Sequence, residues 1–336
     1  MLIPAGLRAP ILTVLFAANA VGQPFQLSRC EIIPLPGHQV SFRIHGEEKL
    51  RWHFDAGYTR PFFHPFRGPS GADLTRIGHP GAQNHDHHRS VWFAHHDVNG
   101  FDFWSENGGT RIRQKLWYAY RDGEEEAVMA SLLGWFDPQG GEVMEADLVT
   151  ALRPLRTGEH LVEIQLTLRP AKKAEKVELR KTNFGVIAVR VAKTMTVHFG
   201  GGQIVDSRGR LGEAEIFGKA AQWMDYSGPV ASGTGPERKA IIEGLTLFDH
   251  PGNPNFPAKW HVREDGWMGP SLCRDADVTV TTEAPLVLRY LLHAHAGPVD
   301  PVAAGRIEKT FHERPGFAVG KSQERHRQFD VWRVKP

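Results

Sequence analysis

Histidine is concentrated in one segment of this 336-residue chain, between Tyr58 and Trp104. Seven of the 18 histidines lie there, although the segment covers less than a fifth of the sequence: His64, His79, His85, His87, His88, His95 and His96. An imidazole takes up and releases a proton near pH 7, so the cluster predicts acid–base chemistry on a bound ligand. A solvated strand end, whose histidines bond to nearby loops, is the alternative interpretation.

A tight hairpin is predicted beside this cluster. The dipeptide Asn99–Gly100 favours a two-residue turn, with a strand over residues 89–97 and its partner from residue 101 onward. Side chains alternate along a strand, which places His87 and Arg89 on the same face. A guanidinium binds oxygen atoms and a neutral imidazole exchanges protons, so this pair suits an anionic or polyhydroxylated ligand. His87 is therefore the first candidate for a general acid or base.

A second group of reactive side chains follows at residues 248–267, FDHPGNPNFPAKWHVREDGW. Acids, imidazoles, a guanidinium and indoles occur here without a hydrophobic period, which is typical of a functional loop; an ordered structural loop is the alternative. We expect the two segments to line one cleft, with His64, His85, His87, His88 and Arg89 facing His250, His261 and Arg263. The candidate catalytic residues are His85, Asp86, His87, His88, Asp249 and His261. The candidate ligand-binding residues are Arg60, His64, Arg89, Asp97, Trp104, His250, Asn253, Trp260, Arg263 and Trp267.

Period-two alternation of apolar and polar residues dominates the rest of the chain. It is clearest over residues 162–169, and strand-rich runs recur around residues 39–44, 50–54, 112–120, 127–136, 142–152, 186–191, 241–248 and 286–293. One short helix is expected near Asp300 to His312, with Asp300 as its N-cap and Pro301 at its first position. Many punctuated strands with almost no helix predict an all-β fold, one large antiparallel β-sandwich.

Charge and the N-terminal segment restrict the partners and the compartment. The chain carries 40 Lys and Arg against 38 Asp and Glu, a formal charge of +2, which argues against nucleic acid as a partner. Residues 1–22 are typical of a signal peptide, and no later run is long and apolar enough to span a membrane. We therefore expect an exported protein, periplasmic or secreted, whose residues 23–336 form a single domain. In such an oxidising compartment, Cys30 and Cys273 either form a disulfide or stay two buried thiols.

Four segments together resemble one bacterial family. They are TRPFFHPFRGPSG from Thr59, NHDHHRSVWFAHHDVNGFDFW from Asn84, KTNFGVIAVRVAKTM from Lys181 and the segment at 248–267. The pattern is similar to the PmoA-like family and extends over most of the chain after residue 22. That family carries the label methane oxygenase, a name shared with an integral membrane subunit, which the lack of a spanning segment contradicts. The resemblance implies an association with sugar catabolism and a sandwich similar to the galactose-mutarotase type.

Three functions fit these observations. The first is a carbohydrate-active enzyme, a hydrolase, lyase or epimerase that uses acid–base chemistry on a sugar or glycan and requires no cofactor. The second is an oxygenase or hydrolase that depends on a divalent metal such as iron or zinc, because His85-x-His87 and His95-x-Asp97 resemble the start of metal-binding motifs. The third is a sugar-binding protein without catalysis, against which the histidine cluster counts. We expect the first.

Overall fold

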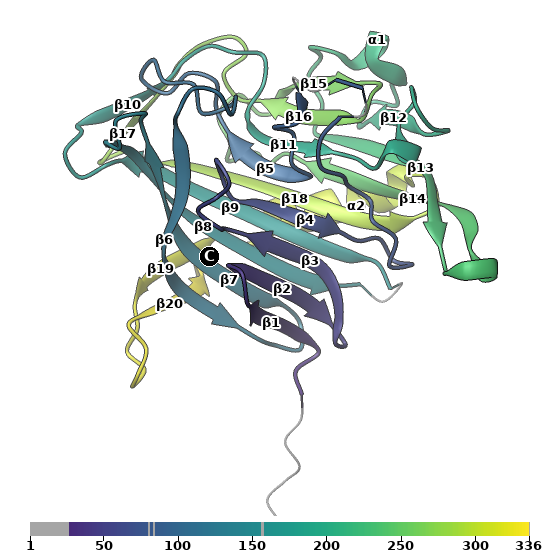
Figure 1. The fold of residues 1–336 in the computed structure, drawn as a ribbon, viewed down its shortest axis with the longest axis horizontal. Helices are drawn as coiled ribbons and strands as arrows, with labels where there is room; N and C mark the ends of the chain where they lie inside the picture. The colour runs from purple at the N-terminus through teal and green to yellow at the C-terminus, as the bar shows by residue number, and fades with distance from the viewer. Residues whose placement is uncertain (1–26, 80, 83–84, 156–157, 336) are drawn as a thin grey trace, which may run out of the picture.

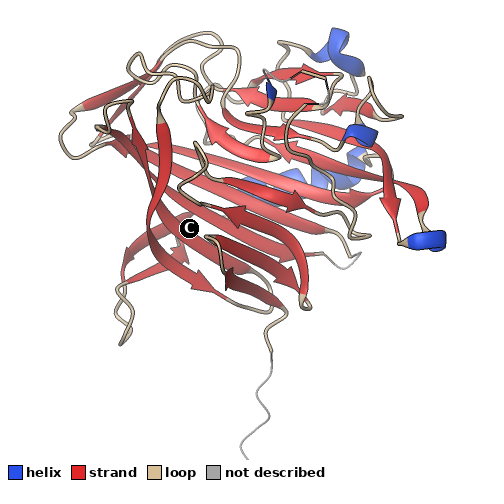
Figure 2. Ribbon diagram, viewed as in Figure 1, coloured by secondary structure: helices blue, strands red, loops and turns tan. Residues whose placement is uncertain are grey.

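Alternating side chains build two large antiparallel sheets that face each other (Figure 1). The computed structural model describes residues 27–79, 81–82, 85–155 and 158–335, and the predicted signal peptide at residues 1–22 lies outside this range. Strands make up most of the secondary structure and helices are few (Figure 2). The predicted all-β sandwich of antiparallel sheets is therefore confirmed.

The first sheet has eight strands in the order β1-β2-β3-β4-β5-β11-β16-β15. These strands are β1 (Cys30–Leu35), β2 (Gln39–Ile44), β3 (Glu47–His53), β4 (Phe62–Phe66), β5 (Val91–Ala94), β11 (Val186–Arg190), β16 (Trp267–Ser271) and β15 (Lys259–Arg263). Strands β5 and β11 lie far apart in the sequence but pair directly, with Phe93 opposite Ile187. One end of this sheet therefore combines the histidine-rich segment with the segment at 248–267.

The second sheet also has eight strands, in the order β12-β13-β14-β18-β9-β8-β7-β6. These strands are β12 (Gln203–Asp206), β13 (Trp223–Ser232), β14 (Lys239–Phe248), β18 (Leu286–Ala296), β9 (His160–Pro170), β8 (Glu142–Pro154), β7 (Ala127–Phe136) and β6 (Arg111–Arg121). The alternation in β9 places Val162, Ile164 and Leu166 in the core, as predicted.

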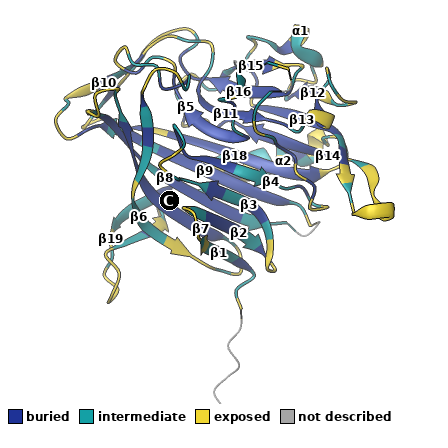
Figure 3. Ribbon diagram, in the orientation of Figure 1, coloured by how far each residue is buried: buried dark blue, intermediate teal, exposed yellow. Residues whose placement is uncertain are grey.

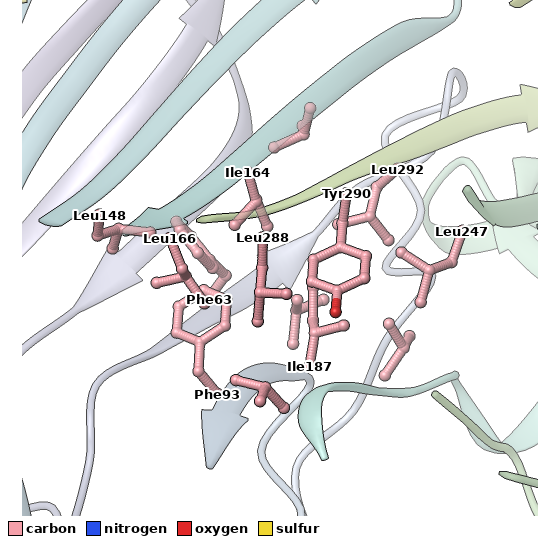
Figure 4. Packing of buried hydrophobic residues seen from close by; sticks show 14 of the residues in the cluster. Phe63, Phe93, Leu148, Ile164, Leu166, Ile187, Leu247, Leu288, Tyr290 and Leu292 are labelled. Atoms are coloured by element: carbon pink, nitrogen blue, oxygen red, sulfur yellow. The ribbon is translucent and has the colours of Figure 1, made fainter. Parts of the chain in front are cut away.

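Buried apolar side chains of both sheets form one continuous core. Figure 4 shows Phe63, Phe93 and Ile187 of the first sheet packed toward Leu166 and Leu288 of the second. Full burial of such a side chain contributes about 1.5–3 kcal/mol each, so this interface dominates the stability of the sandwich. The central strands of both sheets are buried, while the tip of the β13–β14 hairpin is exposed (Figure 3).

Smaller elements close the ends and the outer faces. Strands β10 (Lys176–Leu179) and β17 (Val278–Thr281) form one two-stranded sheet, and β19 (Phe317–Lys321) and β20 (Phe329–Arg333) form another. Short helical segments are α1 (Gly212–Ile216), η2 (Lys193–Met195) and η3 (Gly235–Glu237). None of the helices in the described ranges has the length and hydropathy needed to cross a membrane.

The predicted helix near residue 300 is present as α2 (Pro301–Glu313). The Asp300 side chain accepts a hydrogen bond from the amide of Val302, which makes Asp300 the N-cap and confirms the expected start. Phe311 of α2 belongs to a cluster with Leu291 of β18, so the helix covers the outer face of the second sheet.

The predicted hairpin at Asn99–Gly100 is a turn without a strand pair. Both residues have positive φ, 53° and 87°, as a tight hairpin turn requires, but only the single bridge Val98–Phe101 flanks them. The strand expected over residues 89–97 exists only at β5, which pairs with β4 and β11 instead. Ser90 has a φ of 59°, so it interrupts the extended backbone and the alternation that grouped Arg89 with the strand is wrong.

Candidate functional site

Strand alternation exposes a polar stripe on the outer face of the first sheet, at its β11-β16-β15 end. Trp260 of β15 is buried in the core, so its neighbours His261 and Arg263 face outward. Trp267 of β16 belongs to a separate hydrophobic cluster on the outer face. The prediction that Trp260 contacts ligand is therefore corrected: its ring faces the core, and its Nε1 donates to the carbonyl of Ala221 at 2.8 Å.

His85, His87 and His88, which we call the histidine trio, lie in a turn above this stripe. The ring centroids of His85 and His88 are 5.0 Å apart, and those of His87 and His88 are 4.4 Å apart. Arg60 fixes this turn to the segment around Trp104. Its side chain is 1% exposed and donates hydrogen bonds to the carbonyls of His87 (3.2 Å) and Trp104 (2.5 Å). Burial lowers the pKa of Arg60 to about 10, which leaves it charged at neutral pH. Arg60 therefore positions the trio instead of contacting ligand as predicted.

Aromatic rings surround the trio. His88 stacks on Trp92 with a centroid distance of 5.2 Å and meets the edge of Trp267 at 4.6 Å. Trp104 lies 5.1 Å from Trp267 and 4.7 Å from Phe184. Tight packing of large rings fixes their orientation, so the trio and the outward stripe meet at a rigid wall.

Between these groups lies a pocket of about 470 Å³. It is lined by His85, His87, His88, Trp104, Phe184, Arg190, His261, Arg263, Asp265 and Trp267. Seven of these residues were predicted site residues, and they come from both segments of the sequence that the prediction joined. The volume is within the range of about 300–1,000 Å³ that small-molecule sites occupy.

An ion pair anchors the floor of this pocket. The Arg190 side chain is 1% exposed and donates to Oδ1 of Asp265 at 2.5 Å, while Oδ2 of Asp265 is 2.8 Å from Nε2 of His79. Burial acts to raise the pKa of Asp265, but the charge and the hydrogen bond of Arg190, with a further bond from His79, lower it overall. Asp265 is therefore a carboxylate at neutral pH and holds the Arg190 guanidinium in place.

The imidazoles of His85, His88 and His261 are neutral at pH 7. Burial lowers the pKa of His85, and it lowers that of His88 far below the usual range, with Arg190 adding to both effects. Burial also lowers the pKa of His261 to about 4. The Nδ1 of His261 donates to the carbonyl of Asn183 at 3.0 Å, so the neutral ring keeps its lone pair on Nε2. These rings accept protons or hydrogen bonds and add no positive charge.

Three predicted residues of the second segment lie elsewhere, on the second sheet. Asp249 follows β14 and accepts hydrogen bonds from Asn253 (2.7 Å) and from the amide of Ala258 (2.9 Å). His250 accepts from Arg289 of β18 at 2.9 Å. All three are buried and order the proline-rich loop beneath α2. The prediction that His250 lines the shared cleft is therefore wrong, and Asp249 and Asn253 also lie outside the pocket lining. The chain passes from one sheet to the other between residues 249 and 259, which no local pattern reveals.

Four predicted residues of the first segment also lie outside the pocket lining. Arg89 pairs with Glu106 at 2.9 Å, and its guanidinium lies over the Tyr58 ring at 5.1 Å. The carbonyl of His64 accepts from a neighbouring strand, Asp97 caps the turn that follows it, and Asp86 is exposed. The shared-cleft prediction is corrected for His64, because β5, β11 and β16 lie between β4 and β15 in the sheet, and for Arg89, because its guanidinium is paired with Glu106.

The sequence prediction missed Phe184 and Arg190, and it included Asp265 in the second segment without giving it a role in the site. Arg190 carries the one charge in β11, whose five residues are all buried. A charge in such an apolar run is costly unless it is paired, which is a signal for a built site. Asp265 lies in the β15–β16 turn, where Gly266 has a φ of 105°, and this turn aims the carboxylate back over the sheet.

The sequence left two questions open: whether the histidine motifs bind a metal, and whether the two cysteines form a disulfide. Within the described ranges, no group of three or more His, Cys, Asp or Glu side chains is arranged to hold a metal ion. Nε2 of His95 is 2.8 Å from the carbonyl of Arg180, and the ring is buried. Cys30 and Cys273 are buried free thiols, so of the two alternatives the structure has the unpaired one.

A protein-family model matches most of the chain. Residues 39–310 match the family of unknown function DUF6807, and this range contains every residue that lines the pocket. No curated protein matches the chain. Because the match covers well over half of its length, the chain belongs to the family of unknown function DUF6807.

Proposed function

We propose that this protein is a carbohydrate-active enzyme whose pocket binds a sugar or a sugar derivative and exchanges protons with it through imidazole side chains. The observation that carries the proposal is the meeting of Trp104, Phe184 and Trp267 with four imidazoles, two guanidiniums and a carboxylate around one pocket. A sugar ring presents apolar C–H faces and a rim of hydroxyl groups. Aromatic rings and convergent polar groups match those two features.

Charge selects among sugars. The pocket has two guanidiniums, Arg190 and Arg263, against the single carboxylate of Asp265, while the rings of His85, His88 and His261 are neutral. Glu213, which pairs with Arg263, lies outside this lining, so positive charge exceeds negative charge within the pocket itself and favours a sugar that carries a carboxylate or an oxidised carbon over a neutral one. The resemblance to a family associated with sugar catabolism supports a sugar as the substrate in general.

His87 remains the first candidate for proton transfer. It is partly exposed, whereas His88 is 2% exposed and stacked beneath the indoles. A group that gives and takes protons during turnover must reach both the ligand and solvent, which favours His87 and the partly exposed His85. The buried, neutral ring of His88 is suited to orienting its neighbours.

The test begins with a screen of glycosides, including uronic acids and keto sugars, followed by kinetics of His85→Asn, His87→Asn and His88→Asn. Asparagine keeps polarity but does not titrate near neutral pH. Loss of the proton-transfer residue is expected to lower kcat about a hundredfold, without a change in the thermal melt. His45→Asn is the control, because His45 is exposed, lies in the β2–β3 turn and has a φ of 51° that asparagine tolerates.

Three results contradict parts of the proposal. Full activity in all three variants would remove the trio from the chemistry. Binding of a sugar without turnover of any glycoside would make the protein a sugar-binding module. Loss of activity on chelation, with recovery on adding a divalent metal, would favour the metal-dependent alternative.

A further inference from the structure

A second hollow adjoins the pocket on the outer face of the first sheet. It measures about 350 Å³ and is lined by His79, His198, Phe199, Glu213, Arg263, Glu264 and Asp265. Arg263 and Asp265 line both hollows. The two spaces therefore meet at the β15–β16 turn, and a ligand that fills the first and extends past this turn enters the second. We call them the inner and the outer pocket.

The residues at the junction are held in fixed positions. Asp265 is bound by Arg190 and His79, as described above. Arg263 donates to Oε1 of Glu213 at 2.5 Å, and its guanidinium lies 4.6 Å from the centroid of the Phe217 ring. Its carbonyl also accepts a hydrogen bond from the buried Tyr226 hydroxyl of the second sheet. Arg263 and Asp265 are therefore held in fixed positions between the two pockets before any ligand binds.

The outer pocket has its own aromatic face. The Phe199 ring meets His198 edge-on at 4.5 Å and His79 at 5.6 Å, and Lys193 lies 5.8 Å from its centroid. Phe199 is partly exposed and its amide is anchored by Thr196 at 2.9 Å, so the ring is both accessible and held. The Phe199 ring and the carboxylates of the outer pocket together meet the requirements of a sugar unit: a surface for C–H groups and acceptors for hydroxyls.

We propose that the ligand is a glycoside of at least two units, with one unit in the inner pocket, the next against Phe199, and the linkage between them beside Asp265 and Arg263. This inference rests on the proposed function and narrows it, because a monosaccharide would fill only the inner pocket. The two pockets differ in their linings. The inner one has three aromatic rings and adds Arg190 to the shared Arg263 and Asp265, whereas the outer one adds Glu213 and Glu264 to the same pair. The more anionic or oxidised unit is therefore expected inside and a neutral unit outside.

The experiment compares matched ligands by titration calorimetry on the full chain. The probes are methyl glycosides of glucose, galactose and their uronic acids, and disaccharides that carry the same unit at their non-reducing end. The best disaccharide is expected to bind at least tenfold more tightly than its methyl glycoside. Phe199→Ala is expected to weaken the disaccharide about tenfold and to leave the methyl glycoside unchanged, because it removes only the outer ring. Trp104→Ala is expected to weaken both.

Controls separate this inference from the proposed function. Phe199→Leu keeps apolar volume without the ring and serves if the alanine variant folds poorly. Trp332→Ala, an exposed aromatic of β20 that lines neither pocket, is expected to change nothing. Equal affinity for both ligand lengths, with no effect of either Phe199 variant, would overturn the two-unit ligand and leave the proposed function standing. A failure of every glycoside and disaccharide to bind would overturn both.

Discussion

Replacing Asp265 with asparagine isolates the ion pair beneath the pocket. The change leaves the Arg190 guanidinium, which is 1% exposed, without the charged partner that it holds at 2.5 Å. Breaking a fully buried pair costs about 3–5 kcal/mol and breaking a surface pair about 0–1 kcal/mol. The Asp265 side chain is 29% exposed, so we expect Asp265→Asn to lower the free energy of unfolding by about 2–3 kcal/mol.

Urea denaturation of the single variants Asp265→Asn and Arg190→Met and of the double variant measures this effect as a mutant cycle. We expect the double variant to be no less stable than Asp265→Asn, because it removes the uncompensated charge. The exposed pair Lys259–Asp275 gives the matched control, and Asp275→Asn is expected to cost less than about 0.5 kcal/mol. Additive losses in the cycle, or a loss at Asp265 as small as in the control, would refute the idea that this pair supports the pocket.

The same pair predicts a pH dependence. The pKa of Asp265 is lowered by Arg190 and His79 in spite of burial, so the folded state binds its proton more weakly than the unfolded chain does. The stabilisation is therefore fully present above the ordinary aspartate pKa of about 4 and is lost as the pH falls through the lower folded value. The stability difference between the wild type and Asp265→Asn is expected to shrink below pH 4. A difference that stays constant to low pH would contradict this account.

Three further outcomes are expected. Gly244→Ala is expected to destabilise the protein in urea denaturation, because the added Cβ would lie 2.2 Å from a buried histidine ring. Gly305→Ala in α2 is expected to stabilise it by about 0.5–1 kcal/mol in the same assay, because no atom lies within 4 Å of the added Cβ and alanine favours the helix. Burial raises the pKa of Asp249 to about 6, so protonation of this side chain favours the folded state. The free energy of unfolding that this protonation contributes is expected to fall as the pH rises from 4 to 6. Asp249→Asn is expected to remove this slope from a plot of stability against pH. Cys30 and Cys273 are buried and burial raises their thiol pKa values, to about 11 and about 12, so a thiol reagent is expected to react with neither in the native protein and with both after unfolding; protection from the reagent in denaturant would indicate a disulfide instead.

Strands were predictable because their signal is local. Val162, Ile164 and Leu166 reveal their face by simple alternation, and the N-cap Asp300 reveals the start of α2. The order of strands in the sheets was not predictable in the same way. Pairing β5 with β11 joins segments about ninety residues apart, and only the three-dimensional packing of apolar faces selects that partner.

The sequence predicted which residue types form the site, but it predicted only some of the individual residues that line the pocket. His261 and Arg263 reach the pocket because β15 alternates, whereas Asp249 and His250, about ten residues earlier, lie in the loop that follows β14 of the other sheet. Similar residue types therefore line a pocket in one case and order a loop in the other. Arg190 was missed because its strand looks like pure core, and its role depends on Asp265, about seventy-five residues away.

The indole cluster beside the pocket also provides an intrinsic fluorescence signal for ligand binding. Trp92, Trp104 and Trp267 have mutual centroid distances of 5.6, 5.7 and 5.1 Å, and the last two line the inner pocket. Rings this close exchange excitation energy, so their emission and their near-ultraviolet dichroism depend on one shared environment. Displacement of water from that wall changes the signal of all three at once. Occupancy of the pocket can therefore be followed by intrinsic fluorescence, without a label and before any reaction has been identified.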